Sequence, residues 1–351
     1  MVGIITYYQI SNYGANLQAL ALQKYIEDQG FTSFIVKHKC KSIKKRTIIT
    51  EKRIFCNYEN KTKAFNKLLS DFKKFFSFML FRKKFLRIRK FNPNNDKLII
   101  GSDQVWNTDI NGCDSFYYFS GYNGRKYAYA ASFGYDFVPS KHLGFLQENL
   151  CLFERIGIRE AQGKKILSSQ FHINSYIVLD PVFLVEKSFW KTLLKNTKKD
   201  YTSFLYIKSL KITNLIRFLN KNYSNLIFLN YSDYNIKSDI LKYDAQSSPY
   251  EWISYIANSH LVVTNSYHCI LFSIIFEKEF IFFFNKKQHY LSRFFSLFRI
   301  LGISGKTTEI SVDESVFLPN LDYKNIMIRK ELLLRNSKMF LNEILKELES
   351  D

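Results

Sequence analysis

The sequence has 351 residues, of which 46% are hydrophobic, so it can fold into two domains with sizeable cores and is not disordered as a whole. The five cysteines are scattered and lack C-x-x-C spacing, which argues against a disulfide framework or a zinc site and predicts a reducing, cytoplasmic location. The N-terminus does not have the pattern of a signal peptide, and no apolar run reaches membrane-spanning length.

The net charge of +20 is concentrated in residues 39–91, which contain 18 Lys or Arg residues and three acids. No nucleic-acid-binding motif accompanies this charge, so we expect no nucleic-acid partner. Within the stretch, residues 64–91 mix Phe and Leu with Lys and Arg at roughly helical spacing. Two interpretations remain open: a core-facing helix with a solvated basic face, or a helix that makes peripheral contact with an anionic membrane or a polyanionic sugar.

Alternating strands and helices are predicted along the first half of the chain. Residues 2–7 form an apolar run that predicts a strand, a polar turn covers residues 9–16, and a helix follows to residue 29. Further strands are predicted at residues 34–36, 98–100, 125–131, 155–158 and 177–179, and further helices at 139–150 and from about 161 to 168. This order is typical of a Rossmann-like domain, although the first turn lacks the G-x-G-x-x-G fingerprint.

Polar side chains follow four of these strands. They lie in residues 11–16, 102–107, 132–134 and 159–160. In an open α/β sheet, ligands bind just beyond the carboxyl ends of the strands, so we expect these four segments to form one wall of a shared cleft.

A second βαβ set begins after residue 180. Strands are predicted at residues 203–207, 225–229, 260–264 and 280–284, with helices at 212–222, 249–257, 266–276 and 292–301. A long amphipathic helix is predicted from residue 323 to the C-terminus. We therefore predict an α/β fold of two Rossmann-like domains in a glycosyltransferase-B-like arrangement, divided as residues 1–180, 181–322 and 323–351, with the last segment a helix and residues 39–91 an insertion.

His268 stands out among the candidate functional residues because it lies between an apolar strand and an apolar helix, after the helix N-cap candidate Ser266. A histidine in the first turn of a helix suits a neutral base or a donor to phosphate, or it binds a carbonyl structurally. Arg159 can bind a carboxylate or a phosphate through its planar fork, whereas Glu160 favours the helix dipole. Asp103 can hold a sugar hydroxyl, act as a base or cap its own turn.

Several site types are not predicted. The other histidines have no acidic or thiol partner at metal-ligand spacing, so no metal site is expected. The sequence also lacks a G-x-S-x-G elbow, a Walker loop and an acidic D-x-D at a strand end. These absences argue against serine hydrolases and P-loop enzymes. They also argue against most metal-dependent nucleotide-sugar transferases that have the common glycosyltransferase fold other than the B type.

Taken together, the motifs resemble those of the polysaccharide pyruvyl transferase family. The resemblance covers about residues 3–300 and is specific to the family through the order and spacing of six motifs. These motifs are SNYGANLQ at 11–18, GSDQVWN at 101–107, YAASFG at 129–134, IRE at 158–160, VLDP at 178–181 and NSYH at 265–268.

The resemblance implies transfer of the pyruvyl group of phosphoenolpyruvate to a sugar of a bacterial surface polysaccharide or exopolysaccharide, with no resident cofactor. It implies that His268 is the acid/base and Arg159 the anion clamp, while Asp103 contributes to catalysis and holds the acceptor. The other residues implied at the site are Ser11, Asn12, Gly14, Ser102, Gln104, Asn107 and Ser266. The acceptor is expected to be a sugar or a lipid-linked glycan, and the location cytoplasmic or peripheral to the membrane.

One departure from the family pattern concerns the donor. Some members of the family carry an arginine two residues before the late histidine, where this chain has Ser266. Two alternatives therefore stay open beside the pyruvyl transferase: an enzyme that uses a nucleotide-sugar donor, and a glycan-binding relative without turnover.

Overall fold

The computed structural model describes residues 1–38, 61–195, 202–208, 212–223, 228–230, 241–243 and 247–350, with secondary structure alone for 61–68, 228–230 and 241–243. The predicted basic insertion is therefore described from residue 61 onward, and its first part lies outside the described residues. In the part of the chain that is described, no helix has both the length and the hydropathy that crossing a membrane requires.

The first unit is built on a seven-stranded parallel sheet in the order β3-β2-β1-β4-β5-β6-β7. Its central strands are short apolar runs that are buried on both faces, as expected of a sheet covered by helices on both sides. The strands are β1 (Val2–Ile5), β2 (Ser33–Val36), β3 (Ile88–Arg89), β4 (Lys97–Ile100), β5 (Tyr127–Ala131), β6 (Arg155–Ile158) and β7 (Tyr176–Ile177).

The second unit repeats this architecture in the order β10-β9-β8-β11-β12-β14-β13. The first five strands of this order are parallel, and β14 and β13 extend the sheet as an antiparallel hairpin. The strands are β8 (Ser203–Tyr206), β9 (Phe228–Asn230), β10 (Leu241–Tyr243), β11 (Leu261–Thr264), β12 (Glu279–Asn285), β13 (Ser304–Glu309) and β14 (Glu314–Asn320). Two Rossmann-like sheets in one chain give the predicted glycosyltransferase-B-like fold.

Each sheet reverses its strand order at one point, where a crevice forms beyond the carboxyl ends. In the first sheet β1 lies between β2 and β4, and in the second β8 lies between β9 and β11. The loops after β1, β4, β8 and β11 therefore start at the two reversal points, and the fold brings them together.

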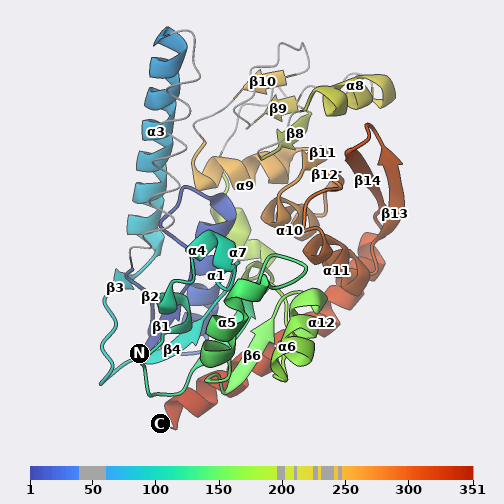
Figure 1. Ribbon diagram of the computed structural model, residues 1–351. Helices are drawn as coiled ribbons and strands as arrows, with labels where there is room; N and C mark the ends of the chain where they lie inside the picture. The colour runs from blue at the N-terminus through green and yellow to red at the C-terminus, as the bar shows by residue number, and fades with distance from the viewer. Residues whose placement is uncertain are drawn as a thin grey trace.

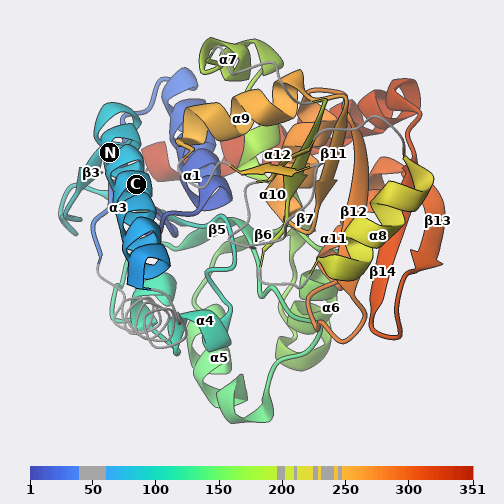
Figure 2. The same ribbon diagram turned by 90° about the horizontal axis from the view of Figure 1, so that it is seen from above.

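Helices connect the two units through a continuous apolar core. Tyr13, the first residue of α1 (Tyr13–Asp28), stacks on Trp252 of α9 (Pro249–Asn258) at a ring-centroid distance of 5.1 Å and donates its hydroxyl to the Ser247 carbonyl at 2.8 Å. The helix α3 (Lys61–Phe85) lies beside α1 and extends past the sheets at one side of the molecule (Figures 1 and 2). One of its faces packs on both units, through Phe78 against Tyr13 and Phe81 against Tyr250.

The predicted C-terminal helix is present as α12 (Tyr323–Glu349), and it crosses from the second unit to the first. It begins where the Tyr323 hydroxyl donates to the Lys278 carbonyl. It then reaches the first unit, where the Leu179 amide donates to Ser337 Oγ at 2.9 Å and the Tyr25 hydroxyl donates to Asn342 Oδ1 at 3.1 Å. Both chain ends consequently lie near each other on the first unit (Figure 1).

Most of the remaining helices lie close to their predicted positions, but the four-residue helix Thr108–Asn111 was not predicted. The remaining helices are α4 (Thr108–Asn111), α5 (Leu143–Leu150), α6 (Ala161–Phe171), α7 (Lys187–Thr192), α8 (Thr213–Asn222), α10 (Tyr267–Ile275) and α11 (Ser292–Leu301). The helix predicted from residue 139 begins only at Leu143, because a short 3-10 turn, Ser140–His142, follows Pro139. The hairpin of β13 and β14 was not predicted at all.

Candidate functional site

A polar cavity of about 250 Å3 lies between the carboxyl ends of the two sheets. The first unit contributes the segments that follow β1, β4 and β6, and the second contributes those that follow β8 and β11 together with the start of α11. The residues that line it are Asn12, Asp103, Gln104, Arg159, Lys208, Asn265, Ser266, Tyr267, His268, Tyr290 and Arg293.

The loop after β4 places Asp103 in this cavity. Gly101 has φ 125°, and a Cβ there would lie 2.1 Å from the Tyr129 carbonyl oxygen, so only glycine fits. Asp103 has φ 72°, a left-handed conformation that aspartate tolerates better than most residues. Its Oδ1 accepts the Gln104 amide at 2.9 Å and lies 3.3 Å from Arg159 Nη2.

Two other polar residues of this loop hold its shape and lie outside the cavity. Ser102 is fully buried and donates its hydroxyl to the Ala130 carbonyl at 3.0 Å. Asn107 caps α4, where its Oδ1 accepts the amides of Asp109 and Ile110 at 3.1 and 3.2 Å. The loop thus has two kinds of polar residue, and only Asp103 and Gln104 reach the cavity.

Arg159 follows β6 and neutralises a cluster of carboxylates. Its Nη1 lies 2.9 Å from Asp180 Oδ2, its Nη2 3.3 Å from Asp103 Oδ1, and its Nε 3.6 Å from Glu160 Oε2. Burial alone would lower the pKa of the guanidinium, but the charges of Asp103 and Asp180 raise it above the ordinary value. Arg159 therefore stays charged, and its guanidinium already faces three carboxylates before any ligand binds.

Glu160 takes a structural position behind Arg159. It is 2% exposed, and its Oε1 accepts the Phe133 amide at 3.2 Å. Burial raises the pKa of this carboxyl, against the opposing charge of Arg159. Glu160 therefore links the end of β5 to the start of α6.

His268 lies in the first turn of α10, directly after β11, and its ring approaches the first unit. Its Nε2 is 3.4 Å from Asp180 Oδ2. Burial would raise the pKa of Asp180, but the neighbouring His268 and Arg159 bring it below the ordinary value. Asp180 therefore carries its negative charge beside the imidazole.

The imidazole of His268 also packs against the start of α1. A Cβ on Gly14 would lie 2.2 Å from His268 Nδ1 and 2.3 Å from its Cγ, so the helix backbone and the ring are in direct contact. Gly14 itself contributes no polar group to the cavity. Its role in this position is to let His268 approach α1.

Lys208 and Arg293 supply the cavity with two cations that the sequence analysis did not single out. Lys208 follows β8, and its backbone is fixed by Asn265, whose amide accepts the Lys208 N–H and donates to the Lys208 carbonyl, both at 2.7 Å. Arg293 lies in the first turn of α11, and its buried Nε has no hydrogen-bond partner among the described residues. Neither cation has a carboxylate within ion-pair distance in the described parts of the chain, so both can receive an anion.

The two cations are held in surroundings that disfavour their charge. Burial lowers the pKa of Lys208 to about 8; Asp103 opposes this shift, and the charges of Lys74 and Arg293 add to it. Burial and the charge of Arg159 likewise lower the pKa of Arg293. An anion that binds between them would relieve both effects.

Tyr267 separates the two arginines. Its ring centroid lies 4.8 Å from the Arg159 guanidinium carbon and 5.6 Å from that of Arg293. Burial raises the pKa of its hydroxyl, so the ring stays neutral. The Tyr267 ring thus contacts both guanidinium groups, with Arg159 paired to its carboxylates on one side and Arg293 facing the cavity on the other.

The predicted site residues are thus distributed unevenly. The structure brings Asn12, Asp103, Gln104, Arg159 and Ser266 together with His268 around the cavity, and it places Ser102, Asn107 and the half-buried Ser11 outside it. Ser266 is the N-cap residue of α10, as predicted, but its side chain makes no cap hydrogen bond and lines the cavity. Among the described residues, no three His, Cys, Asp or Glu side chains are grouped so as to hold a metal.

Comparison with solved structures returns chains of very low identity. A UDP-GlcNAc 2-epimerase from Neisseria meningitidis, bound to UDP-GlcNAc, has a TM-score of 0.49 and 10% identity and covers 99% of both chains. A putative UDP-N-acetylglucosamine 2-epimerase from Listeria monocytogenes has a TM-score of 0.48 and 10% identity, over 96% of this chain and 89% of the other. No curated protein matches the sequence.

The sequence profile of one family does match, and it spans most of the site. The profile of polysaccharide pyruvyl transferases covers residues 12–286, which include every cavity residue except Tyr290 and Arg293. The chain therefore belongs to the polysaccharide pyruvyl transferase family, a family of transferases.

Proposed function

We propose that the protein transfers the pyruvyl group of phosphoenolpyruvate to two hydroxyls of one sugar in a bacterial surface or exopolysaccharide glycan, in the cytoplasm and without a resident cofactor. The observation that carries the proposal is the pair of cations, Lys208 and Arg293, that face the cavity without carboxylate partners in the described residues, beside His268. Phosphoenolpyruvate carries a phosphate and a carboxylate, and two separate cations suit two separate anionic groups. These two cations also compensate for the serine at position 266, where some members of the family carry an arginine.

The chemistry assigns a role to each group. His268 donates a proton to the methylene carbon of the enol phosphate, which leaves an oxocarbenium-like carbon, and a sugar hydroxyl attacks that carbon and loses its proton to a base. The second hydroxyl then forms the second C–O bond while the C–O bond to phosphate breaks, and its proton leaves with inorganic phosphate. Lys208 and Arg293 stabilise the phosphate as it departs. Asp103 and Gln104 hold the acceptor hydroxyls, and Arg159 keeps Asp103 and Asp180 in place.

The donor is tested by thermal unfolding with phosphoenolpyruvate and with a panel of UDP-sugars. Only the true donor should raise the unfolding temperature, because ligand stabilisation grows as RT ln(1+[L]/Kd). We expect phosphoenolpyruvate to do so, and to release inorganic phosphate when a sugar or lipid-linked glycan acceptor is added. Stabilisation by a UDP-sugar alone would overturn the proposal in favour of a glycosyltransferase, and glycan binding with no donor consumed would favour a non-catalytic relative.

The affinity for phosphoenolpyruvate is expected to fall as the pH rises above about 8, because Lys208 loses its proton there. A bound anion raises the pKa of this lysine again, so binding above pH 8 takes up a proton, which calorimetry in buffers of different ionisation enthalpy measures. Lys208→Met is expected to weaken binding about 10- to 100-fold at neutral pH and to remove this dependence. Lys208→Arg, which stays charged, should retain binding at pH 9; an unchanged pH profile in Lys208→Met would contradict the assignment.

Gly14→Ala is expected to lower the transfer rate about 100-fold, because the new methyl group would displace the His268 ring. Binding of phosphoenolpyruvate should change much less, since Lys208 and Arg293 lie on the other unit. Gly144→Ala is the matched control: it adds the same methyl group to a helical glycine with no atom within 4 Å of the new Cβ. That control should be as active as the wild type and equally or more stable.

A further inference from the structure

One face of α3 exposes a row of large apolar side chains. Fourteen large hydrophobic residues are exposed in the described part of the chain. Six of them lie in one twelve-residue segment of this helix, residues 69–80. Phe72 is 65% exposed and Phe75 52%. The six residues, called here the α3 apolar face, are Leu69, Phe72, Phe75, Phe76, Met79 and Leu80.

This face is not the one that holds α3 on the protein. At 100° per residue, the packed side chains Phe78, Phe81 and Phe85 lie on one side of the helix, and the α3 apolar face spans the opposite side. Phe78 and Phe81 are fully buried. The packed side therefore anchors α3 on the protein, and the side chains of the α3 apolar face remain exposed.

The exposed charges around the α3 apolar face are basic. Lys73 and Lys84 lie along one edge of it, Lys83 lies within its span, and the half-buried Asp71 lies beyond the other edge. The whole helix sequence contains eight basic residues and one acid, Asp71. Exposed phenylalanine and leucine with surrounding lysine are typical of a helix that lies in the interface of an anionic bilayer, with its apolar side among the acyl chains.

We propose that α3 docks the protein on anionic membrane through the α3 apolar face, with Lys73, Lys83 and Lys84 against the lipid headgroups. A second copy of the chain is a poorer occupant. A symmetric helix pair would bring these lysines near one another, and α3 offers one acidic residue to balance them.

The docking helix is next to the candidate site. Lys74 lies on the packed side of α3, with its Nζ 5.5 Å from the centroid of the Tyr13 ring, and its charge acts on Lys208 in the cavity. A sugar that is attached to a membrane lipid would consequently be close to the cavity. This last step rests on the proposed function, whereas the docking itself does not.

The test is sedimentation of the full-length protein with vesicles of phosphatidylcholine alone and of phosphatidylcholine with 30% phosphatidylglycerol, a composition chosen as about that of a strongly anionic surface. We expect binding to the anionic vesicles that weakens with salt. Phe72→Glu/Phe76→Glu should abolish it, and each of Lys73→Gln and Lys83→Gln should lower the partition coefficient roughly fivefold. Because sedimentation does not depend on donor or acceptor, failure of the proposed reaction would leave this result unchanged.

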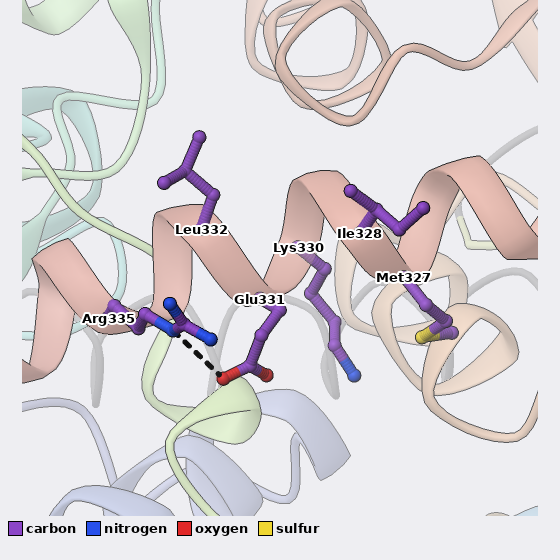
Figure 3. Close-up of a pocket in the computed structure, with 6 residues that line it drawn as sticks. All are labelled: Met327, Ile328, Lys330, Glu331, Leu332 and Arg335. Carbon is purple, nitrogen blue, oxygen red and sulfur yellow. Dashed lines mark ion pairs between the residues drawn. The ribbon is translucent and has the colours of Figure 1, made fainter.

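The exposed part of α12 offers a matched control. Ile328 and Leu332, each 62% exposed, point from one side of this helix, and Lys330, Glu331 and Arg335 lie around a shallow hollow on it (Figure 3). Its charges are mixed, with Glu331 paired to Arg335 at 3.8 Å. Ile328→Glu/Leu332→Glu should therefore leave vesicle binding unchanged.

Two results would overturn the proposal. One is a wild-type protein that does not sediment with anionic vesicles at low salt. The other is a concentration-dependent dimer that Phe72→Glu/Phe76→Glu dissociates, since that would assign the α3 apolar face to a second copy of the chain. Thermal unfolding checks that the double variant is folded, and Lys73→Gln and Lys83→Gln keep the test valid if it is not.

Discussion

Replacing His268 with glutamine is expected to lower the release of phosphate from phosphoenolpyruvate about 100- to 10,000-fold while the donor still binds. Glutamine keeps a polar side chain of similar reach in the space between Asp180 and Gly14 but cannot carry a proton to carbon. Lys208 and Arg293, which lie on other elements, should keep the affinity for phosphoenolpyruvate within a few-fold. The measurement is kcat for phosphate release together with Kd from calorimetry.

A structural role for His268 predicts a different result. If the imidazole only supports α10, His268→Gln should lower the unfolding temperature and reduce donor binding and turnover together. Asp180→Asn provides a second comparison, because it keeps the shape of the group beside Nε2 and removes its charge. Loss of turnover in Asp180→Asn with an altered acid limb of the pH–rate profile would support Asp180 as a positioning residue.

Replacing Arg159 with methionine is expected to lower the free energy of unfolding by about 3–5 kcal/mol, because it leaves buried carboxylates without their cation. Asp103, Asp180 and Glu160 all lie within 3.6 Å of its guanidinium nitrogens, and Arg159 is 3% exposed. The loss is measured by chemical denaturation at several pH values.

The stability loss in Arg159→Met should depend on pH. The direction of this dependence follows from Asp180, whose pKa is lowered in the folded protein. Such a group contributes stability above its unfolded pKa and loses it as the pH falls through the folded pKa. Without Arg159, Asp180 and Glu160 are protonated at a higher pH, so the deficit of the variant should be largest near neutral pH and smaller near about pH 5.

Arg155→Met is the control, because Arg155 begins the strand β6 that Arg159 follows. Arg155 pairs with Glu343 at 2.9 Å and Glu347 at 2.6 Å, but its side chain is 34% exposed. Its removal should cost at most about 1 kcal/mol, because solvent screens exposed ion pairs. Equal losses in the two variants would show that burial of the carboxylates around Arg159 does not carry the effect.

The strands that position the site could be predicted because buried parallel strands are uninterrupted apolar runs. This applies to β1, β4 and β11, and the polar residues predicted after them mark the cavity. The strand β13, SGKTTE, could not be predicted, because its side chains are mostly exposed and show no apolar period. It is a strand through its pairing with β14, which is tertiary information.

The cations of the cavity show the same limit at the level of single residues. Lys208 could in principle have been predicted, since it follows the strand β8 just as Asp103 follows β4. However, this chain has many lysines, and nothing in the sequence distinguishes this one. Arg293 had no local signal, because it lies in an amphipathic helix like any surface arginine. Only the packing of α11 next to α10 brings it to Tyr267 and the cavity.

The path of α12 has a consequence for the stability of the two units. The chain crosses between them near residue 180 and returns through α12, so two covalent connections join them. The C-terminal half of α12 also buries Phe340, Leu341, Ile344 and Leu345 in the apolar core that both units share. A chain cut before Ser337 should therefore expose that core and unfold at a lower temperature than the full chain.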